Sequence, residues 1–280
     1  MDESRPATGR VWYLTAISVL FVMAYLFPIY WMVATSLKGP GDLLAIPPKV
    51  FPWPFDLAAW QQNLTGGGMM LRSILNSTVV ALGTTALSFV LGVAAAYGLA
   101  QLRGRLSRVL VFFTLAAQLI PGIILAGPFF LALARIGLLD SYVGLILANT
   151  TFTLPFAIMV MRPFFLGVPR ELPEAALTDG CNQVQALLRI VIPVVRPGLI
   201  TVGIFNFLSA WGEFQFAYTL TSSETMATAT VFINSFQGQY GIQYNALMAA
   251  STAVSIPIII AIVLLQKYVS EGLAAGSVKD

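Results

Sequence analysis

Residues 11–37 read VWYLTAISVLFVMAYLFPIYWMVATSL and contain no charged side chain. An α-helix rises 1.5 Å per residue, so Trp12 and Trp31 would lie about 28 Å apart, close to the thickness of a hydrocarbon core. Each tryptophan has a tyrosine beside it, which is typical of the aromatic belts at membrane interfaces. A signal peptide has a shorter apolar core of about 7–15 residues. The stretch therefore predicts a retained first transmembrane helix over Val11–Ala34.

The rest of the chain continues this apolar pattern. Of its 280 residues 58% are hydrophobic and 10% are charged, with a mean hydropathy of +0.82. Soluble domains carry about 25% charged residues. Residues 38–70, rich in proline and glycine, predict an extramembrane loop. Together these features predict an all-α membrane protein with six transmembrane helices, the other five being Ser73–Leu102, Val109–Ala134, Ser141–Met161, Gly198–Leu220 and Ala246–Gln266.

The basic residues predict the orientation of these helices. With six spans both termini share one side of the membrane, and cytoplasmic loops carry an excess of lysine and arginine. The side of the termini would hold eleven basic residues and the opposite side four, namely Lys38, Lys49, Arg72 and Arg135. We therefore expect a cytoplasmic N-terminus (1–10), a six-helix permease domain (11–268) with a cytoplasmic loop at 162–196, and a cytoplasmic C-terminal tail (269–280).

Several classes of function are excluded by composition. The chain has no histidine and a single cysteine, Cys181, so we expect neither catalytic residues of the histidine-based kinds nor a metal site. The net charge of +3 comes from scattered basic residues without an aromatic-interleaved patch, which argues against a nucleic-acid partner. No GxxxxGK(S/T) motif is present, so the chain has no phosphate-binding loop for ATP.

Small residues and prolines mark the predicted helices. Gly92 with Ala96, and Ala94 with Gly98, are four residues apart, a spacing that lets helices approach closely unless the residues simply face lipid. Prolines in the helices remove backbone hydrogen bonds and are tolerated beside protein or a wet cavity. They are consistent with a transport pathway but do not establish one, and they lie at Pro121, Pro128, Pro155 and Pro257.

The segment 169–193, PRELPEAALTDGCNQVQALLRIVIP, predicts two short helices inside the cytoplasmic loop. Pro173 suits the first position of a helix, and Gly180 suits its C-terminal cap. Asn182 with Gln185 predicts a capping box for a second helix, which Pro193 would end or kink. The hairpin would either lie at the membrane interface or act as a docking element for a partner.

The same segment resembles the EAA loop of ABC-importer permeases. Glu174-Ala175-Ala176 is followed after four residues by Gly180, and then by Ile190-x-Ile192-Pro193, where the family usually has leucine in place of Ile192. The resemblance implies that partner ATPases dock on this loop, with the small alanines allowing close approach. The residues that it assigns to ATPase coupling are Glu174, Ala175, Ala176, Asp179, Gly180, Ile190 and Pro193.

Further stretches resemble carbohydrate-type permeases related to the maltose system. They are Trp31 with Thr35–Lys38, Leu75–Ser77, Ala94–Tyr97, Gly137–Asp140 and Gly272–Lys279. The resemblance implies a type I ABC importer permease fold in the inner membrane. It also implies a heterodimer with a second, related permease, two ATPase subunits that bind ATP and magnesium, and an extracytoplasmic solute-binding protein. This chain itself would bind no cofactor.

Candidate residues for the substrate pathway are polar side chains in the predicted spans. Where the family often has Trp-Asn-Glu, this chain has Trp211-Gly212-Glu213, and Glu213 is the acidic residue placed well inside a predicted span. Ionisable residues at membrane depth are costly and usually functional, although a shifted span would make Glu213 interfacial. The other candidates, for which an inter-helix hydrogen bond is the alternative, are Gln118, Asn149 and Asn206.

The expected function is ATP-driven import of a sugar or sugar-like solute by alternating access. Glycerol phosphate or a glycerophosphodiester is an alternative cargo for a permease of this kind. A stand-alone channel or secondary transporter is a further alternative, although the paired intramembrane charges usual for that class are absent from the sequence.

Overall fold

The computed structural model describes residues 8–238 and 241–277, and the side chains of 8–11, 265 and 267–277 are not described. The predicted cytoplasmic termini therefore fall partly outside it, at residues 1–7 and 278–280. The chain divides into two compact units, Met1–Met70 with Ile233–Ser255, and Leu71–Phe232 with Ile256–Asp280. Every candidate coupling and pathway residue lies in the second unit.

The first unit contains the N-terminal helix and a short pair of antiparallel β-strands. Residues 12–30 of its first helix are exposed along their whole length, as a lipid-facing segment requires. Asn63 Nδ2 donates to the carbonyl of Ala246 at 3.0 Å. The elements of the first unit are α1 (Thr8–Ser36), α2 (Pro40–Leu43), α3 (Ala58–Thr65), the antiparallel pair β1 (Gln237–Gly238) and β2 (Gly241–Ile242), and the start of α13 (Tyr244–Ser277).

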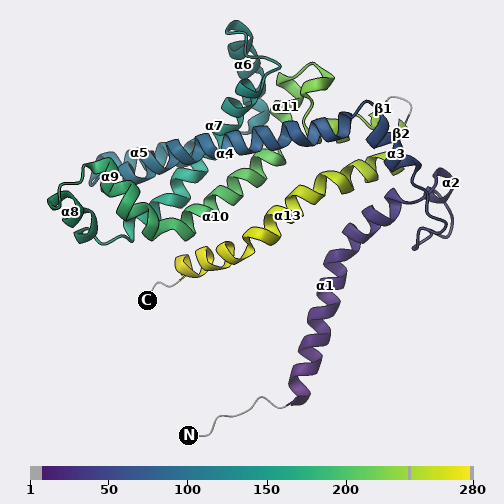
Figure 1. Cartoon of the computed structure of the whole chain (residues 1–280), viewed down its shortest axis with the longest axis horizontal. Coiled ribbons are helices and arrows are strands. Elements are labelled where there is room, and N and C mark those ends of the chain that lie inside the picture. The colour runs from purple at the N-terminus through teal and green to yellow at the C-terminus, as the bar shows by residue number, and fades with distance from the viewer. Residues whose placement is uncertain (1–7, 239–240, 278–280) are drawn as a thin grey trace. The chain divides into compact units, whose positions relative to one another are not determined.

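The second unit is a helical bundle. Its elements are α4 (Met69–Gln101, from Leu71 onward), α5 (Arg105–Gln118), α6 (Gly122–Arg135), α7 (Tyr142–Leu166), α8 (Glu171–Thr178), α9 (Gln183–Ala186), the π-helix η1 (Leu187–Val191), α10 (Ile192–Trp211), α11 (Gln215–Leu220), the 3-10 turn η2 (Glu224–Met226), most of α12 (Ala229–Asn234) and α13 from Ile256 onward. Helix α7 contacts α5, α10 and α11. The hairpin of α8 and α9 lies at one end of the helices α4, α7 and α10 (Figure 1).

Five helices among the described residues are long and apolar enough to cross a membrane. They are Trp12–Ser36, Met69–Gln101, Tyr142–Leu166, Gln183–Trp211 and Tyr244–Leu264, and the pair α5 and α6 passes the same test only if it is counted as one bent span. The predicted all-α membrane architecture is confirmed, and six crossings follow if the bent pair counts as one.

The prediction of a continuous third helix over Val109–Ala134 is wrong. Helices α5 and α6 meet at an angle of 93°. Pro121 precedes α6 with extended backbone (φ −63°, ψ 132°), has no N–H to donate, and disfavours helical backbone at the residue before it. Alone, the 14 residues of α5 measure about 21 Å, which is short of a hydrocarbon core of about 30 Å.

One of the two predicted small-residue pairs lies where two helices of the bundle pack closely. Gly92 and Ala96 are buried, and a Cβ atom on Gly92 would lie 3.2 Å from the Cβ of Ala157 in α7. Ala94 and Gly98 are exposed. The first pair thus serves helix packing, and the second does not within this chain.

Candidate coupling loop and polar residues of the spans

The first helix of the hairpin, α8, ends in a Schellman motif. Gly180 has φ +89°, a left-handed conformation that residues with a Cβ disfavour. Its N–H donates to the carbonyl of Leu177 at 3.1 Å, and the N–H of Cys181 donates to the carbonyl of Ala176 at 3.0 Å. The predicted glycine cap is confirmed, and it fixes the direction in which the chain leaves α8.

The second helix begins at the predicted capping box. Asn182 Oδ1 accepts the N–H of Gln185 at 2.9 Å, and Gln185 Oε1 accepts the N–H of Asn182 at 3.0 Å. Pro173 is the third residue of α8 and not the first, because the helix begins at Glu171. Proline is tolerated there because the first-turn N–H groups have no partner within the helix.

Pro193 was predicted to end or kink the second helix, and it does not end it. The helix runs unbroken over Gln183–Trp211 and so joins the hairpin to the fifth span. Just before Pro193 the backbone widens into the π-helix η1, where the N–H of Ile192 donates to the carbonyl of Leu187, five residues back. A proline ring clashes with the carbonyl four residues before it, here that of Arg189, and the wider turn relieves this clash.

The coupling candidates differ in how far they are buried. Ala176 is buried, with 7% of its surface exposed, so only Ala175 of the alanine pair is accessible from outside. Ile190 is half-buried in η1, whereas Pro193 is exposed. The exposed candidates on the hairpin are Glu174, Ala175, Asp179 and Gly180.

The π-helix η1 that follows the hairpin is packed into the core of the bundle. Val191 in η1 is 1% exposed and belongs to the cluster that contains Ala96 of α4 and Met161 of α7. Helix α8 in turn contacts α9 and η1. The hairpin therefore contacts η1, and η1 is packed against the spans.

A cleft of about 340 Å³ opens between the hairpin and the C-terminal ends of α4 and α7. Glu174 and Arg170 line it from the hairpin side. Tyr97 and Gln101 line it from α4, where the Tyr97 ring meets that of Phe165 edge-to-face with centroids 5.6 Å apart. Glu174 thus lies beside a recess where the hairpin meets the spans.

The predicted fifth span, Gly198–Leu220, is divided at Gly212, and Glu213 lies outside the long helix. Its carboxylate accepts the N–H groups of Phe216 at 2.7 Å and Ala217 at 3.1 Å, while its carbonyl accepts the hydroxyl of Thr230 at 2.7 Å. A carboxylate at a helix N-terminus is stabilised by the free N–H groups there. Glu213 is therefore the N-terminal anchor of α11.

The remaining pathway candidates have separate environments. Gln118 is exposed at the end of α5. Asn149 is buried and donates to the carbonyl of Leu145, one turn back in its own helix. Trp211 and Asn206 in α10 are both buried, and among the described residues the Trp211 Nε1 and both amide atoms of Asn206 have no hydrogen-bond partner.

The structure also contains a polar network that the sequence did not predict as a site. Asn76 Nδ2 donates to the carbonyls of Thr225 and Ala227 at 3.0 and 2.9 Å, and Asn76 Oδ1 accepts the hydroxyl of Tyr142 at 2.6 Å. Arg72 Nε donates to the same Thr225 carbonyl at 2.9 Å. We call Arg72, Asn76, Ser77, Asp140 and Tyr142 the anchor cluster.

The other members of the anchor cluster hold the same segment. Ser77 Oγ accepts the N–H of Ala229 at 2.8 Å, and Asp140 Oδ1 accepts the N–H groups of Ser222 and Ser223 at 3.0 and 3.1 Å. Partial burial raises the pKa of Asp140, but hydrogen bonds from Ser223 and Ser222 outweigh it, so the pKa lies below its ordinary value. The stretches Leu75–Ser77 and Gly137–Asp140 were the signal for this cluster, because both carried the family resemblance.

The stretch Trp31 with Thr35–Lys38, which also carried the family resemblance, is held by contacts within the first unit. The ammonium group of Lys38 lies 4.1 Å from the centre of the Trp31 ring. Ser36 Oγ accepts the indole N–H of Trp60 at 3.2 Å. These residues secure the end of α1 to the loop that follows it.

Residues 88–274 match the family model described as the binding-protein-dependent transport system inner membrane component. The chain belongs to this family. It is thus a multi-pass inner-membrane permease of an ABC importer. The permease is 33% identical over 275 residues to the diacetylchitobiose uptake system permease protein DasC of Streptomyces coelicolor, covering 98% of this chain and 99% of that protein.

One further relative and one solved structure are similar to this permease over almost its whole length. It is 35% identical over 272 residues to the sulfoquinovosyl glycerol transport system permease protein SmoH of Agrobacterium fabrum, covering 97% of this chain and 95% of that protein. Its fold matches a chain of a bacterial ABC transporter that imports the acidic polysaccharide alginate, with a TM-score of 0.77 at 23% identity, over 95% of this chain and 99% of that one. The type I importer permease fold is confirmed.

Proposed function

We propose that this permease moves a sugar or sugar-like solute inward across the cytoplasmic membrane by alternating access, driven by partner ATPases. Similarity to permeases named for diacetylchitobiose and for sulfoquinovosyl glycerol supports a carbohydrate cargo over glycerol phosphate. The full assembly would contain a second, related permease, two ATPase subunits that bind ATP and magnesium, and an extracytoplasmic solute-binding protein. Both termini and the 162–196 loop would lie in the cytoplasm.

The observation that carries the proposal is the continuity of the hairpin with the fifth span. The helix Gln183–Trp211 has 29 residues and so extends about 43 Å. One end of it is held by the capping box and by packing on α8. The other end leads into α11, whose first turn is anchored by Glu213. A closing ATPase pair that pushed on Glu174, Asp179 and Gly180 would therefore displace α10 through this helix.

Asn206 and Trp211 are the pathway candidates that the structure supports best. Both are buried in α10, and an unpaired buried amide or indole N–H costs about 1–3 kcal/mol. A solute hydroxyl group would satisfy either side chain when α10 moves and exposes it. Glu213 would affect the substrate pathway only indirectly, because its carboxylate holds the first turn of α11.

Charge removal on α8 tests the coupling. Glu174→Gln should lower solute uptake and substrate-stimulated ATP hydrolysis together by roughly tenfold, about 1.4 kcal/mol of lost coupling, in liposomes that contain the assembled transporter. Glu171→Gln is the matched control, because Glu171 is also exposed on α8 but lies outside the motif. Equal activity of the two variants would refute a docking role for Glu174.

A further inference from the structure

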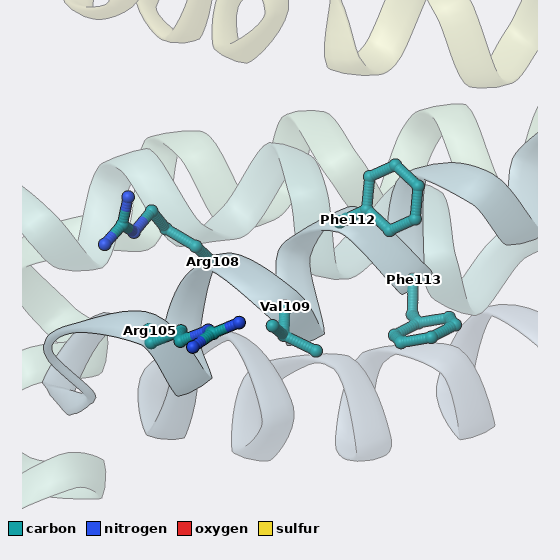
Figure 2. Close-up of a pocket in the computed structure, with 5 residues that line it drawn as sticks. All are labelled: Arg105, Arg108, Val109, Phe112 and Phe113. Atoms are coloured by element: carbon teal, nitrogen blue, oxygen red, sulfur yellow. The ribbon is translucent and has the colours of Figure 1, made fainter.

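A groove on the surface of α5 combines two arginines with apolar side chains (Figure 2). It is open and shallow, and its lining consists of Arg105, Arg108, Val109, Phe112 and Phe113, all from α5. In Figure 2 Val109 lies in one row with Arg105 and Phe113, and Arg108 and Phe112 form a second row beside it. Positions three and four residues apart share one face of a helix, so the groove runs along α5.

The two ends of the groove differ in chemistry. Arg105 is the first residue of α5, and Phe113 lies eight residues further, which is about 12 Å along the axis. The charged groups therefore occupy the N-terminal end, and the aromatic rings occupy the end toward the middle of the helix. Phe112 and Phe113 are 65% and 64% exposed, and their rings meet edge-to-face with centroids 5.8 Å apart.

The positive charge of the groove is not neutralised by its surroundings. Within the described part of the chain neither Arg105 nor Arg108 forms an ion pair, and the sequence of α5 contains no acidic residue. A guanidinium group forms two parallel hydrogen bonds with a phosphate, so either arginine offers a site for a phosphate group. The apolar end offers contact to a hydrocarbon chain.

We propose that this groove binds an anionic phospholipid, with the phosphate held by Arg105 and Arg108 and an acyl chain lying along Val109, Phe112 and Phe113. The axial separation of charge from apolar surface matches the layout of a lipid, whose headgroup and chain follow one another along the membrane normal. A soluble anion would leave the aromatic end uncovered. The anionic lipids of the cytoplasmic leaflet attract each basic residue near the membrane surface by about 1 kcal/mol. This inference rests on the proposed orientation, in which the N-terminal end of α5 lies on the cytoplasmic side.

The test measures lipids bound to the full-length chain, both alone and in the assembled transporter, after exchange into mixed micelles of phosphatidylglycerol and phosphatidylcholine. Native mass spectrometry should show phosphatidylglycerol retained in preference to phosphatidylcholine. The double variant Arg105→Gln/Arg108→Gln should weaken this retention by roughly 30-fold, since each basic residue near an anionic headgroup contributes a factor of about five. Arg103→Gln/Arg189→Gln, with the same charge change at exposed positions outside the groove, should retain the lipid.

Two further measurements distinguish a bound lipid from other ligands of the groove. Phe112→Ala/Phe113→Ala should also reduce retention of phosphatidylglycerol, and an excess of soluble glycerol phosphate should not displace it. Displacement by glycerol phosphate would overturn the proposal in favour of a site for a free anion. Equal loss in the two double arginine variants, or loss of the lipid when the second permease assembles with this chain, would also overturn it. Arg105→Lys/Arg108→Lys keeps the charge and should retain part of the binding if the glutamine variant does not fold.

Discussion

Adding one methyl group to Gly198 in α10 should destabilise the bundle. A Cβ atom there would lie 2.6 Å from Cγ of the Phe164 ring in α7, and still closer to its Cδ1 and Cε1. Real Cβ atoms do not approach other atoms so closely, so the ring or the helix must move. Overpacking of this kind costs about 1–3 kcal/mol. Alanine also recovers about 0.8–1 kcal/mol of helix propensity relative to glycine, so the net loss is about 0–2 kcal/mol.

Gly203 is the matched control for this prediction. It lies in the same helix, and a Cβ atom on it would have nothing within 4 Å. Gly203→Ala therefore gains the helix propensity without the clash, and the two alanine variants should differ by about 1–3 kcal/mol. Because the propensity term is the same in both, this difference isolates the contact between α7 and α10.

Thermal unfolding of the purified chain in detergent is the assay. Membrane proteins commonly unfold irreversibly, so the scan rate is held constant and the apparent Tm values of the two variants are compared. Gly198→Ala should unfold at a lower temperature than Gly203→Ala, and adding Phe164→Ala should reduce the difference that the methyl group causes at position 198. Equal Tm values for the two glycine variants would refute the close approach of α7 and α10.

Three other predictions concern caps and charges. Gly180→Ala should destabilise the hairpin by about 1–2 kcal/mol and lower coupled ATP hydrolysis. Gly180→Asn should be less destabilising, because asparagine tolerates a left-handed backbone. A larger loss of stability with asparagine than with alanine would point to steric contact at the cap instead. Asn182→Ala removes a capping bond worth about 1 kcal/mol and should speed hydrogen exchange at the Gln185 amide, and unchanged exchange would argue against the capping box. The pKa of Asp140 is lowered in the folded chain, so its stabilisation is complete above the unfolded value of about 3.9 and is lost as the pH falls through the folded value. Asp140→Asn keeps an acceptor and should flatten the dependence of Tm on pH in that acidic range, and a dependence as steep as in the wild type would contradict this role.

The sequence predicted most of the spans because their apolar runs are long and their caps are local. It also predicted the Gly180 and Asn182 caps, since both depend on residues within one turn of the helix. The effect of each proline was harder to predict. Pro121 breaks a helix at 93°, whereas Pro193 is accommodated by a π turn, and the difference depends on backbone adjustments that no residue pattern shows.

The polar residues were predicted less well than the hairpin. Glu213 was placed inside a span because the apolar run continues past Gly212, yet its carboxylate caps a separate short helix. Asn76 and Asp140 form hydrogen bonds with partners 66 to 151 residues away in sequence. Such long-range pairs cannot be derived from spacing, although the family resemblance pointed to both stretches.

Site-specific cross-linking of Ala175 tests the central claim most directly. Ala175 is exposed on α8, so Ala175→Cys in a Cys181→Ser background places a single reactive thiol on the hairpin. In intact cells this thiol should be protected from a membrane-impermeant maleimide, and in inverted vesicles it should form a cross-link with the ATPase subunit. Labelling from outside intact cells, or the absence of any cross-link to an ATPase in the assembled transporter, would contradict the coupling role of the hairpin.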